Sequence, residues 1–279
     1  PDEVKQINQI PYLPIEFFKQ ENVVCKPNNV DAVFTSSGTS GIQSKHIIYN
    51  IGIYEKSFTS GFEYFYGNIK DYIILALLPS YLERSGSSLI YMCEKLIKHS
   101  GKKESGFYLN DHKELKDLLL ELECQNQKTL LIGVSFALID FVEKHPVGLK
   151  NTIVMETGGM KGRREEMVRE ELHRILSTCL NISKIHSEYG MTELLSQAYS
   201  KGDGIFQCPP WMRVSCRETN DPLSINKKSG CLNIIDLANV YSCSFIASQD
   251  LGKINENNTF EVLGRFDASD IRGCNLMVV

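Results

Sequence analysis

The sequence lacks a long hydrophobic run. The longest apolar stretch, Ile73–Leu78, covers only six residues, whereas a membrane-spanning helix needs about 20. No basic segment followed by an apolar stretch and a cleavage site opens the chain, as a secretory signal would. We therefore expect a soluble protein with no membrane span.

A strong excess of charge of either sign is also missing. The 279 residues include 30 Lys and Arg against 34 Asp and Glu, which gives a net charge of −4. Such a balance provides no overall attraction for nucleic acid. We therefore expect no nucleic-acid partner.

The nine cysteines form no Cys-x-x-Cys pair and no dense framework of the kind that staples small secreted proteins. Their odd number leaves at least one of them unpaired. A reducing compartment is the simplest setting for such a chain, so we expect a cytoplasmic protein. Cys208 and Cys216 lack the spacing of zinc ligands, and we expect no zinc site.

Between residues 70 and 190, short apolar segments alternate with helical patterns. The expected strands are Tyr72–Leu78, Thr129–Val134, Asn151–Met155 and Ile182–His186. The expected helices are Ser87–His99, His112–Cys124 and Arg163–Leu180. This alternation is typical of βα units. It predicts an α/β fold with mostly parallel sheets flanked by helices.

After Tyr199 the pattern changes to Gly, Pro and Asn turns between short β-prone pieces such as Cys231–Ile235 and Thr259–Leu263. This change indicates a smaller β-rich subdomain at the C-terminal end. We therefore divide the chain into an α/β core of residues 1–200, with an irregular N-terminal lead-in, and a β-rich subdomain of residues 201–279.

A loop rich in hydroxyls and glycine follows the strand-like segment Asp31–Phe34. It reads Thr-Ser-Ser-Gly-Thr-Ser-Gly over residues 35–41, with Lys45 just beyond and the helical pattern Tyr49–Phe65 after it. Glycine lets backbone amides approach an anion closely, hydroxyls donate to oxygen, and lysine adds positive charge. The loop therefore predicts a triphosphate site.

Two other kinds of segment have a composition similar to that of this loop. A Walker A loop is disfavoured, because it requires lysine directly after the second glycine, where this chain has Ile42. A flexible Ser/Gly linker has a similar composition. The flanking strand and helix favour the phosphate loop.

A second cluster, Ser187–Glu193, follows directly on the expected strand Ile182–His186 and reads Ser-Glu-Tyr-Gly-Met-Thr-Glu. Loops at the carboxyl ends of parallel strands are where α/β proteins bind ligands. Thr192 could contact a phosphate and Glu193 a hard cation such as Mg²⁺. The alternative is that Thr192 or Glu193 caps a following helix.

These two clusters, in this order, resemble motifs of the adenylate-forming superfamily of acyl-CoA synthetases, luciferases and peptide-synthetase adenylation domains. Two later segments, Ser248–Gly252 and Leu263–Asp267, are similar to the T-G-D-L-G and G-R-x-D motifs, although Gln249 replaces a glycine. The resemblance implies the large N-terminal domain of these enzymes, with residues 201–279 completing the nucleotide site, and ATP and Mg²⁺ as cofactors. It implies a nucleotide site formed by Ser36, Ser37, Gly38, Thr39, Ser40, Gly41, Gly158, Gly159, Tyr189, Gly190, Thr192, Asp250 and Arg265, with Glu193 on the metal.

Within the superfamily, the sequence most resembles the acyl-protein synthetases of the bacterial luminescence fatty acid reductase complex. These proteins activate a fatty acid with ATP, take the acyl group onto their own cysteine and pass it to a reductase partner. By position, the resemblance implies Cys274 as the acyl acceptor. With Lys45 and Thr192, Cys274 completes the expected catalytic residues.

The sequence departs from the larger superfamily members at its end, because only 14 residues follow Arg265. Those members carry a mobile lid of about a hundred residues after the arginine motif. Either this family dispenses with the lid, or the sequence is a piece of a longer one. Two competing functions are an acyl-CoA or acyl-carrier ligase, and a non-catalytic scaffold that binds nucleotide or acyl groups.

Overall fold

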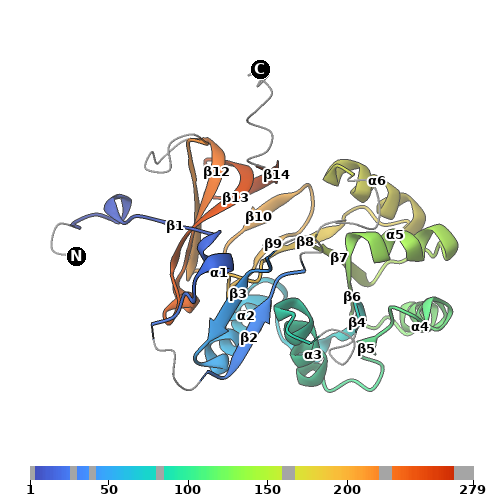
Figure 1. Cartoon of the computed structure of the whole chain (residues 1–279). Coiled ribbons are helices and arrows are strands. Elements are labelled where there is room, and N and C mark those ends of the chain that lie inside the picture. The colour runs from blue at the N-terminus through green and yellow to red at the C-terminus, as the bar shows by residue number, and fades with distance from the viewer. Residues whose placement is uncertain are drawn as a thin grey trace.

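A computed structural model describes residues 4–25, 30–37, 42–79, 85–158, 167–219 and 228–266. The centre of the molecule is one large sheet (Figure 1). Its strands are β1 (Leu13–Pro14), β4 (Ile73–Leu77), β5 (Gly106–Phe107), β6 (Thr129–Val134), β7 (Thr152–Thr157), β8 (His186–Tyr189), β9 (Ala198–Ser200), β10 (Ile205–Gln207), β11 (Met212–Arg217), β12 (Ser229–Asp236), β13 (Phe245–Ile254) and β14 (Phe260–Arg265). A separate hairpin is formed by β2 (Ala32–Thr35) and β3 (Lys45–Ile48).

The helices are α1 (Phe17–Gln20), α2 (Ile51–Tyr66), α3 (Ser88–Ser100), α4 (His112–Cys124), α5 (Ser135–Lys144) and α6 (Arg169–Leu180). Three short 3₁₀ turns are η1 (Ile7–Gln9), η2 (Ile69–Asp71) and η3 (Leu237–Asn239). The α5 helix was not expected from the sequence.

The sheet has a parallel half and an antiparallel half. The order β5-β4-β6-β7-β8 is parallel, and β9, β10, β14, β13, β12 and β11 continue it in antiparallel pairs, with β1 added beside β13. The predicted α/β class with a β-rich C-terminal part is therefore confirmed. Residue 200 ends β9, and β10 lies beside it in the same sheet.

Two hydrophobic cores cover the two faces of the parallel half. In β4, Ile74 and Ala76 face α2 and α3, whereas Ile73, Leu75 and Leu77 face α4, α5 and α6. This alternation follows from the two-residue period of a strand, and Figure 1 shows the two helix layers on either side. A third core fills the antiparallel half and includes Phe206, Leu232 and Phe260.

The strand expected at Ile182–His186 is displaced, since β8 occupies His186–Tyr189. Asn181 adopts a left-handed conformation with φ 51° at the end of α6, and the Ile182 amide bonds back to the Ser177 carbonyl at 3.1 Å. Ile182 therefore closes the helix rather than opening the strand. Ser187, Glu188 and Tyr189 lie inside the sheet.

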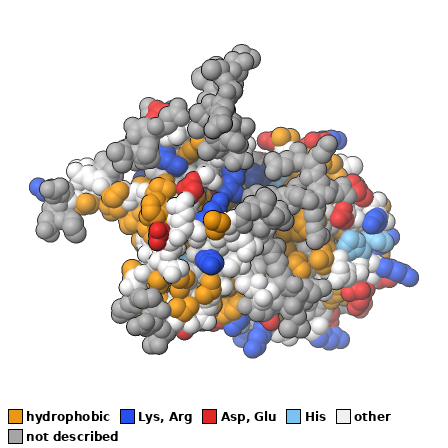
Figure 2. Space-filling model, in the orientation of Figure 1, with side chains coloured by type: hydrophobic (Ala, Val, Ile, Leu, Met, Phe, Trp, Pro, Cys, Tyr) orange, Lys and Arg blue, Asp and Glu red, His pale blue; other side chains and the backbone are white. Residues whose placement is uncertain are grey.

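Acidic and basic side chains are intermixed where α4, α5 and α6 reach the surface in Figure 2, in keeping with the balanced composition. Within the described ranges, no helix is both long and apolar enough to cross a membrane.

Candidate active site

The hydroxyl-rich segment connects the two strands of the β2–β3 hairpin. Thr35 pairs with Lys45, the Ser36 amide donates to the Ser44 carbonyl at 3.1 Å, and the Ser44 amide donates to the Ser36 hydroxyl at 3.0 Å. The sequence predicted a helix directly after this loop, but β3 intervenes and α2 begins only at Ile51. Residues Gly38, Thr39, Ser40 and Gly41 lie outside the described residues, and Ser37 is exposed.

The first residues of β3 point to opposite faces of the hairpin. Ser44 and His46 are buried, whereas Lys45 between them is exposed. Because successive side chains alternate along a strand, the Lys45 ammonium lies on the face away from Ser44 and His46. Its catalytic role stays a prediction.

The second motif begins inside β8 and continues as a loop to β9. Glu188 and Tyr189 are buried, Gly190 is exposed, and Thr192 is half-buried. The segment between β8 and β9 contains no helix, so the alternative in which Thr192 or Glu193 caps one is wrong. Glu193 is instead buried at 6% exposure.

The two motifs meet, although they lie about 150 residues apart in the sequence. The Ser44 hydroxyl hydrogen-bonds the Glu193 carboxylate. His46 Nδ1 lies 2.9 Å from the Thr192 carbonyl oxygen. The residues that follow the hydroxyl-rich loop are therefore in direct contact with the last two residues of the second motif.

Two residues from the antiparallel half reach the same place. Burial raises the pKa of Glu193, and the nearby Asp250 carboxylate raises it further, while the Ser44 hydroxyl and the positive charge of Arg265 lower it. Asp250 and Arg265 are paired neighbours on β13 and β14. The Tyr189 hydroxyl donates to Asp250 Oδ2 at 2.7 Å, which ties β8 to β13.

Gly158 directly follows β7, the strand beside β8. Its φ of +70° is in the region that favours glycine, and the Ser135 hydroxyl donates to its carbonyl at 2.9 Å. Gly159 lies outside the described residues. Gly158 thus stands at the carboxyl end of the parallel strands, where the sequence predicted it.

Glu188 was missed as a distinctive residue, because the sequence placed it in a loop. It is buried at 7% exposure in β8 and accepts a hydrogen bond from the Thr157 hydroxyl. Burial raises its pKa to about 7, against the opposing effect of the Thr157 hydroxyl. A Cβ at Gly190 would overlap the Glu188 carboxylate, so any larger residue there would have to displace this carboxylate.

Asp236, the residue before η3, was also missed. Its carboxylate is fully buried and accepts from the amides of Leu195 and Ser196 at 2.8 and 2.9 Å. It also accepts from the Ser196 hydroxyl at 2.5 Å and the Ala238 amide at 3.0 Å. A lone Asp after a hydrophobic strand carries no sequence signal for such a contact.

A metal ion would find oxygen ligands rather than a closed protein cage. Within the described ranges, no group of three or more His, Cys, Asp or Glu is arranged to hold a metal. Glu193 and Asp250 are hard oxygen donors close enough to interact electrostatically. Mg²⁺ binds characteristically through one or two carboxylates together with substrate phosphates. The donor set therefore fits a magnesium ion that arrives with a nucleotide.

The predicted acyl acceptor, Cys274, lies outside the described residues. The described cysteines are all free thiols. Burial raises the pKa of several of them, to about 12 for Cys208 and about 11 for Cys216. Such thiols are poorly ionised and so weak nucleophiles.

No known protein-family model matches the sequence, and no curated protein does. Solved structures do share its fold. ATP-bound MatB from Rhodopseudomonas palustris matches with a TM-score of 0.65 at 15% identity, over 86% of this chain and 49% of that one. The AMP complex of the O-succinylbenzoate coenzyme A synthetase MenE from Bacillus subtilis matches with a TM-score of 0.58 at 16% identity, over 88% and 51%.

The luciferase-like enzyme from the nonluminescent mealworm Zophobas morio is also similar, with a TM-score of 0.58 at 14% identity over 87% of this chain and 60% of that enzyme. The chain thus spans between about half and three fifths of these enzymes. Its fold is that of the N-terminal domain of adenylate-forming enzymes, as the motifs implied.

Proposed function

We propose that this protein activates a carboxylic acid, a fatty acid, by joining it to AMP from ATP. The acyl group then passes to Cys274 and on to a partner protein, which the resemblance identifies as an acyl-CoA reductase. This is the reaction of an acyl-protein synthetase, and the chain would belong to the adenylate-forming ligases.

The observation that supports it best is the meeting of four motif segments at Glu193. The hydroxyl-rich loop reaches its carboxylate through Ser44, the adjacent Thr192 is held by His46, and Arg265 and Asp250 act on it electrostatically. Solved structures of the same fold include an ATP-bound and an AMP-bound enzyme. A coincidental resemblance would not require the motifs to converge.

The proposed chemistry requires fixed positive charge and hydrogen-bond donors. A carboxylate oxygen of the acid attacks the α-phosphorus of ATP, the new O–P bond forms, and the bond to the β-phosphate oxygen breaks as pyrophosphate leaves. Negative charge gathers on the phosphate oxygens, and preorganised donors stabilise it. The hydroxyls of Ser36, Ser37 and Thr192 and the cations Lys45 and Arg265 are the candidates.

The remaining residues would hold the nucleotide and its metal. Asp250, which accepts a hydrogen bond from the Tyr189 hydroxyl, would accept hydrogen bonds from the ribose hydroxyls, and Gly158 would let the backbone approach the base. Mg²⁺ on Glu193 would neutralise phosphate charge. The pKa of Glu193 affects this binding, because only the ionised carboxylate binds a cation.

In the second step, the Cys274 sulfur attacks the carbonyl carbon of the acyl adenylate. A C–S bond forms, the C–O bond to AMP breaks, and the thiol proton passes to solvent. The acyl thioester then transfers to the partner by the same exchange. The alternative, transfer to coenzyme A or a carrier thiol, is favoured by one observation, namely that MenE of similar fold is a coenzyme A synthetase.

The test is acid-dependent exchange of pyrophosphate into ATP over a panel of fatty, aromatic and polar acids. Glu193→Gln keeps the side-chain shape but removes the charge, and we expect it to abolish exchange while the protein remains folded. Glu114→Gln, the same change on an exposed residue of α4, should leave exchange intact. Exchange at the wild-type rate in Glu193→Gln would refute the assigned role.

The acyl acceptor is tested separately. With radiolabelled fatty acid and ATP, we expect label on the wild-type polypeptide and none on Cys274→Ser, while pyrophosphate exchange continues in both. Label that moves directly to added coenzyme A in Cys274→Ser would favour the ligase alternative. ATP binding without any acid-dependent exchange would favour a scaffold.

A further inference from the structure

The backbone of the segment Thr192–Ser196 is held by side chains from other parts of the chain. Asn239 Nδ2 donates to the Glu193 carbonyl at 2.7 Å, and Asp236 accepts from the amides of Leu195 and Ser196. These bonds run between segments about 40 residues apart. The conformation that presents Glu193 is therefore imposed from outside the segment.

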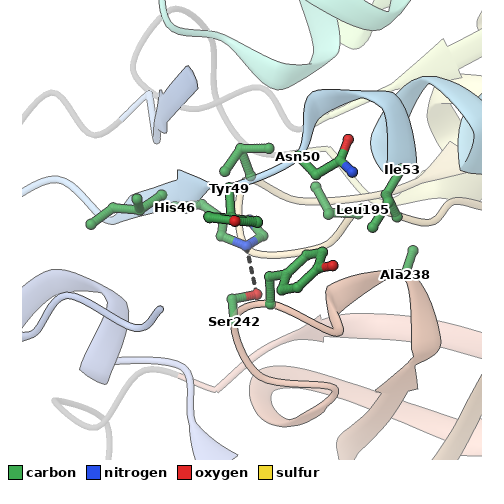
Figure 3. A pocket seen from close by; sticks show the side chains of 10 residues that line it. His46, Tyr49, Asn50, Ile53, Leu195, Ala238 and Ser242 are labelled. Atoms are coloured by element: carbon green, nitrogen blue, oxygen red, sulfur yellow. Dashed lines mark hydrogen bonds between the residues drawn. The ribbon is translucent and has the colours of Figure 1, made fainter. Parts of the chain in front are cut away.

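His46 makes the corresponding contact at the first residue of this segment. Its ring is fully buried, with Nδ1 at 2.9 Å from the Thr192 carbonyl oxygen and Nε2 at 2.8 Å from the Ser242 hydroxyl. The edge of the Phe18 ring packs against it at 5.3 Å between centroids. Figure 3 shows His46 directed from β3 toward Ser242, beside a small hollow lined by Leu195 and Ala238.

The chemistry of the two partners fixes the direction of both bonds. A carbonyl oxygen can only accept, so Nδ1 carries the ring hydrogen and donates it to Thr192. In the neutral ring Nε2 has a lone pair only, and the Ser242 hydroxyl donates to it. His46 thus acts as a rigid connector with one donor end and one acceptor end.

The same strand contacts the second motif at a second point. Ser44, which directly precedes β3 and lies on the same face of the hairpin as His46, hydrogen-bonds the Glu193 carboxylate. His46 holds the preceding peptide carbonyl. Two contacts from one strand fix both the backbone and the side-chain end of this residue, which a single contact would not do.

We propose that His46 is a positioning residue for adenylate formation, and that its Nδ1–H bond to Thr192 sets where the Thr192 hydroxyl and the Glu193 carboxylate meet the nucleotide. The proposal rests on the proposed function above. His46 touches neither substrate nor metal. It acts through the peptide that it holds.

Two amide variants separate the two bonds of the ring. Asparagine carries its amide nitrogen one bond beyond Cγ, as histidine carries Nδ1, so His46→Asn keeps a donor for Thr192. Glutamine carries its amide atoms one bond further out, near the place of Nε2, so His46→Gln keeps a partner for Ser242 and loses the donor to Thr192. Ser242→Ala removes the other bond and leaves the ring.

We expect pyrophosphate exchange, normalised to folded protein, to fall roughly 10- to 100-fold in His46→Gln, because misplacing a reacting group by about 1 Å can cost about 10²-fold. His46→Asn and Ser242→Ala should stay close to wild type. The magnesium concentration for half-maximal exchange should rise in His46→Gln alone. Hydrogen–deuterium exchange of the peptide over residues 190–197, measured without ligand, should also quicken in His46→Gln alone.

Equal exchange rates in His46→Gln and His46→Asn would overturn the proposal, since the ring would then serve only packing. If wild type shows no acid-dependent exchange with any acid, the proposed function fails. The hydrogen–deuterium comparison then decides the claim by itself. A quickened 190–197 peptide in His46→Gln alone would keep His46 as the residue that positions the segment, and equal protection in both variants would remove it.

Discussion

Replacing Glu188 by glutamine should stabilise the protein at neutral pH. The Glu188 carboxyl is buried in β8, where it accepts a hydrogen bond from the Thr157 hydroxyl. Burial raises its pKa from the ordinary 4.5 to about 7, and the negative charge of Glu156 acts in the same direction. The fold therefore favours the protonated, neutral carboxyl over the ionised one.

The magnitude follows from the gap between the two pKa values. The pKa rises from 4.5 to about 7, and each pKa unit corresponds to about 1.4 kcal/mol. Ionisation of Glu188 therefore lowers the free energy of unfolding by about 3 kcal/mol. Because the folded-state pKa is raised, the stabilising contribution of the neutral group is fully present below pH 4.5 and is lost as the pH rises through 7. Glutamine is neutral throughout and still accepts from Thr157, so Glu188→Gln should not suffer this loss.

The assay is urea unfolding of wild type and Glu188→Gln at half-unit steps from pH 5 to pH 8.5. We expect the variant to exceed wild type by less than about 1 kcal/mol at pH 5 and by about 3 kcal/mol at pH 8.5. The difference between the two proteins cancels every other titrating group. A constant difference across this range, or a variant less stable at pH 8.5, would refute the reasoning.

Two further predictions concern carboxylates that accept several hydrogen bonds. Asp236→Asn should lower the free energy of unfolding by about 3 kcal/mol or more. In either orientation, the NH₂ of the new amide faces two of the donors whose hydrogen bonds the carboxylate now accepts. Urea unfolding measures this loss, and Ser196→Ala, which removes one donor only, is the comparison. Glu123→Gln should cost about 1–2 kcal/mol at pH 7, because Glu123 accepts from the amides of Lys150 and Asn151 and from the Thr152 hydroxyl. Burial raises the pKa of Glu123, but these hydrogen bonds outweigh it and lower the pKa below 4.5. The stabilising contribution of the carboxylate is therefore present above pH 4.5 and is lost as the pH falls. The difference in unfolding free energy between wild type and Glu123→Gln should be smaller at pH 3.5 than at pH 7, and an unchanged difference would contradict the prediction.

Elements with regular apolar spacing were predictable from the sequence. Thr129–Val134 and His112–Cys124 form β6 and α4 with the expected bounds. In α4 the residues that pack on the sheet, Leu115, Leu119 and Leu122, recur at helical spacing. Burial of apolar area drives their formation, and that signal is local.

Two of the elements that were missed, β3 and β8, bury polar residues. In β3 His46 is buried along with Ile48, Ser44 is buried just before the strand, and Lys45 is exposed. In β8 the buried residues are Ser187, Glu188 and Tyr189. Neither segment shows the apolar alternation from which a strand is predicted, so the sequence predicts a loop for the first and a turn for the second.

Polar burial and the candidate site coincide for a physical reason. A buried polar group is tolerated only where it finds a partner, and the partners of these residues lie far away in the sequence, at a separation of 146 residues for His46 and Thr192. No local pattern encodes such a pair, which exists only after folding has brought the β2–β3 hairpin against the segment that follows β8. Conversely, sequences depart from simple patterning where a site needs polar side chains at fixed positions. The segments where apolar periodicity fails, 44–46 and 187–193, are therefore those in which substitutions should change activity more than their effect on stability would suggest.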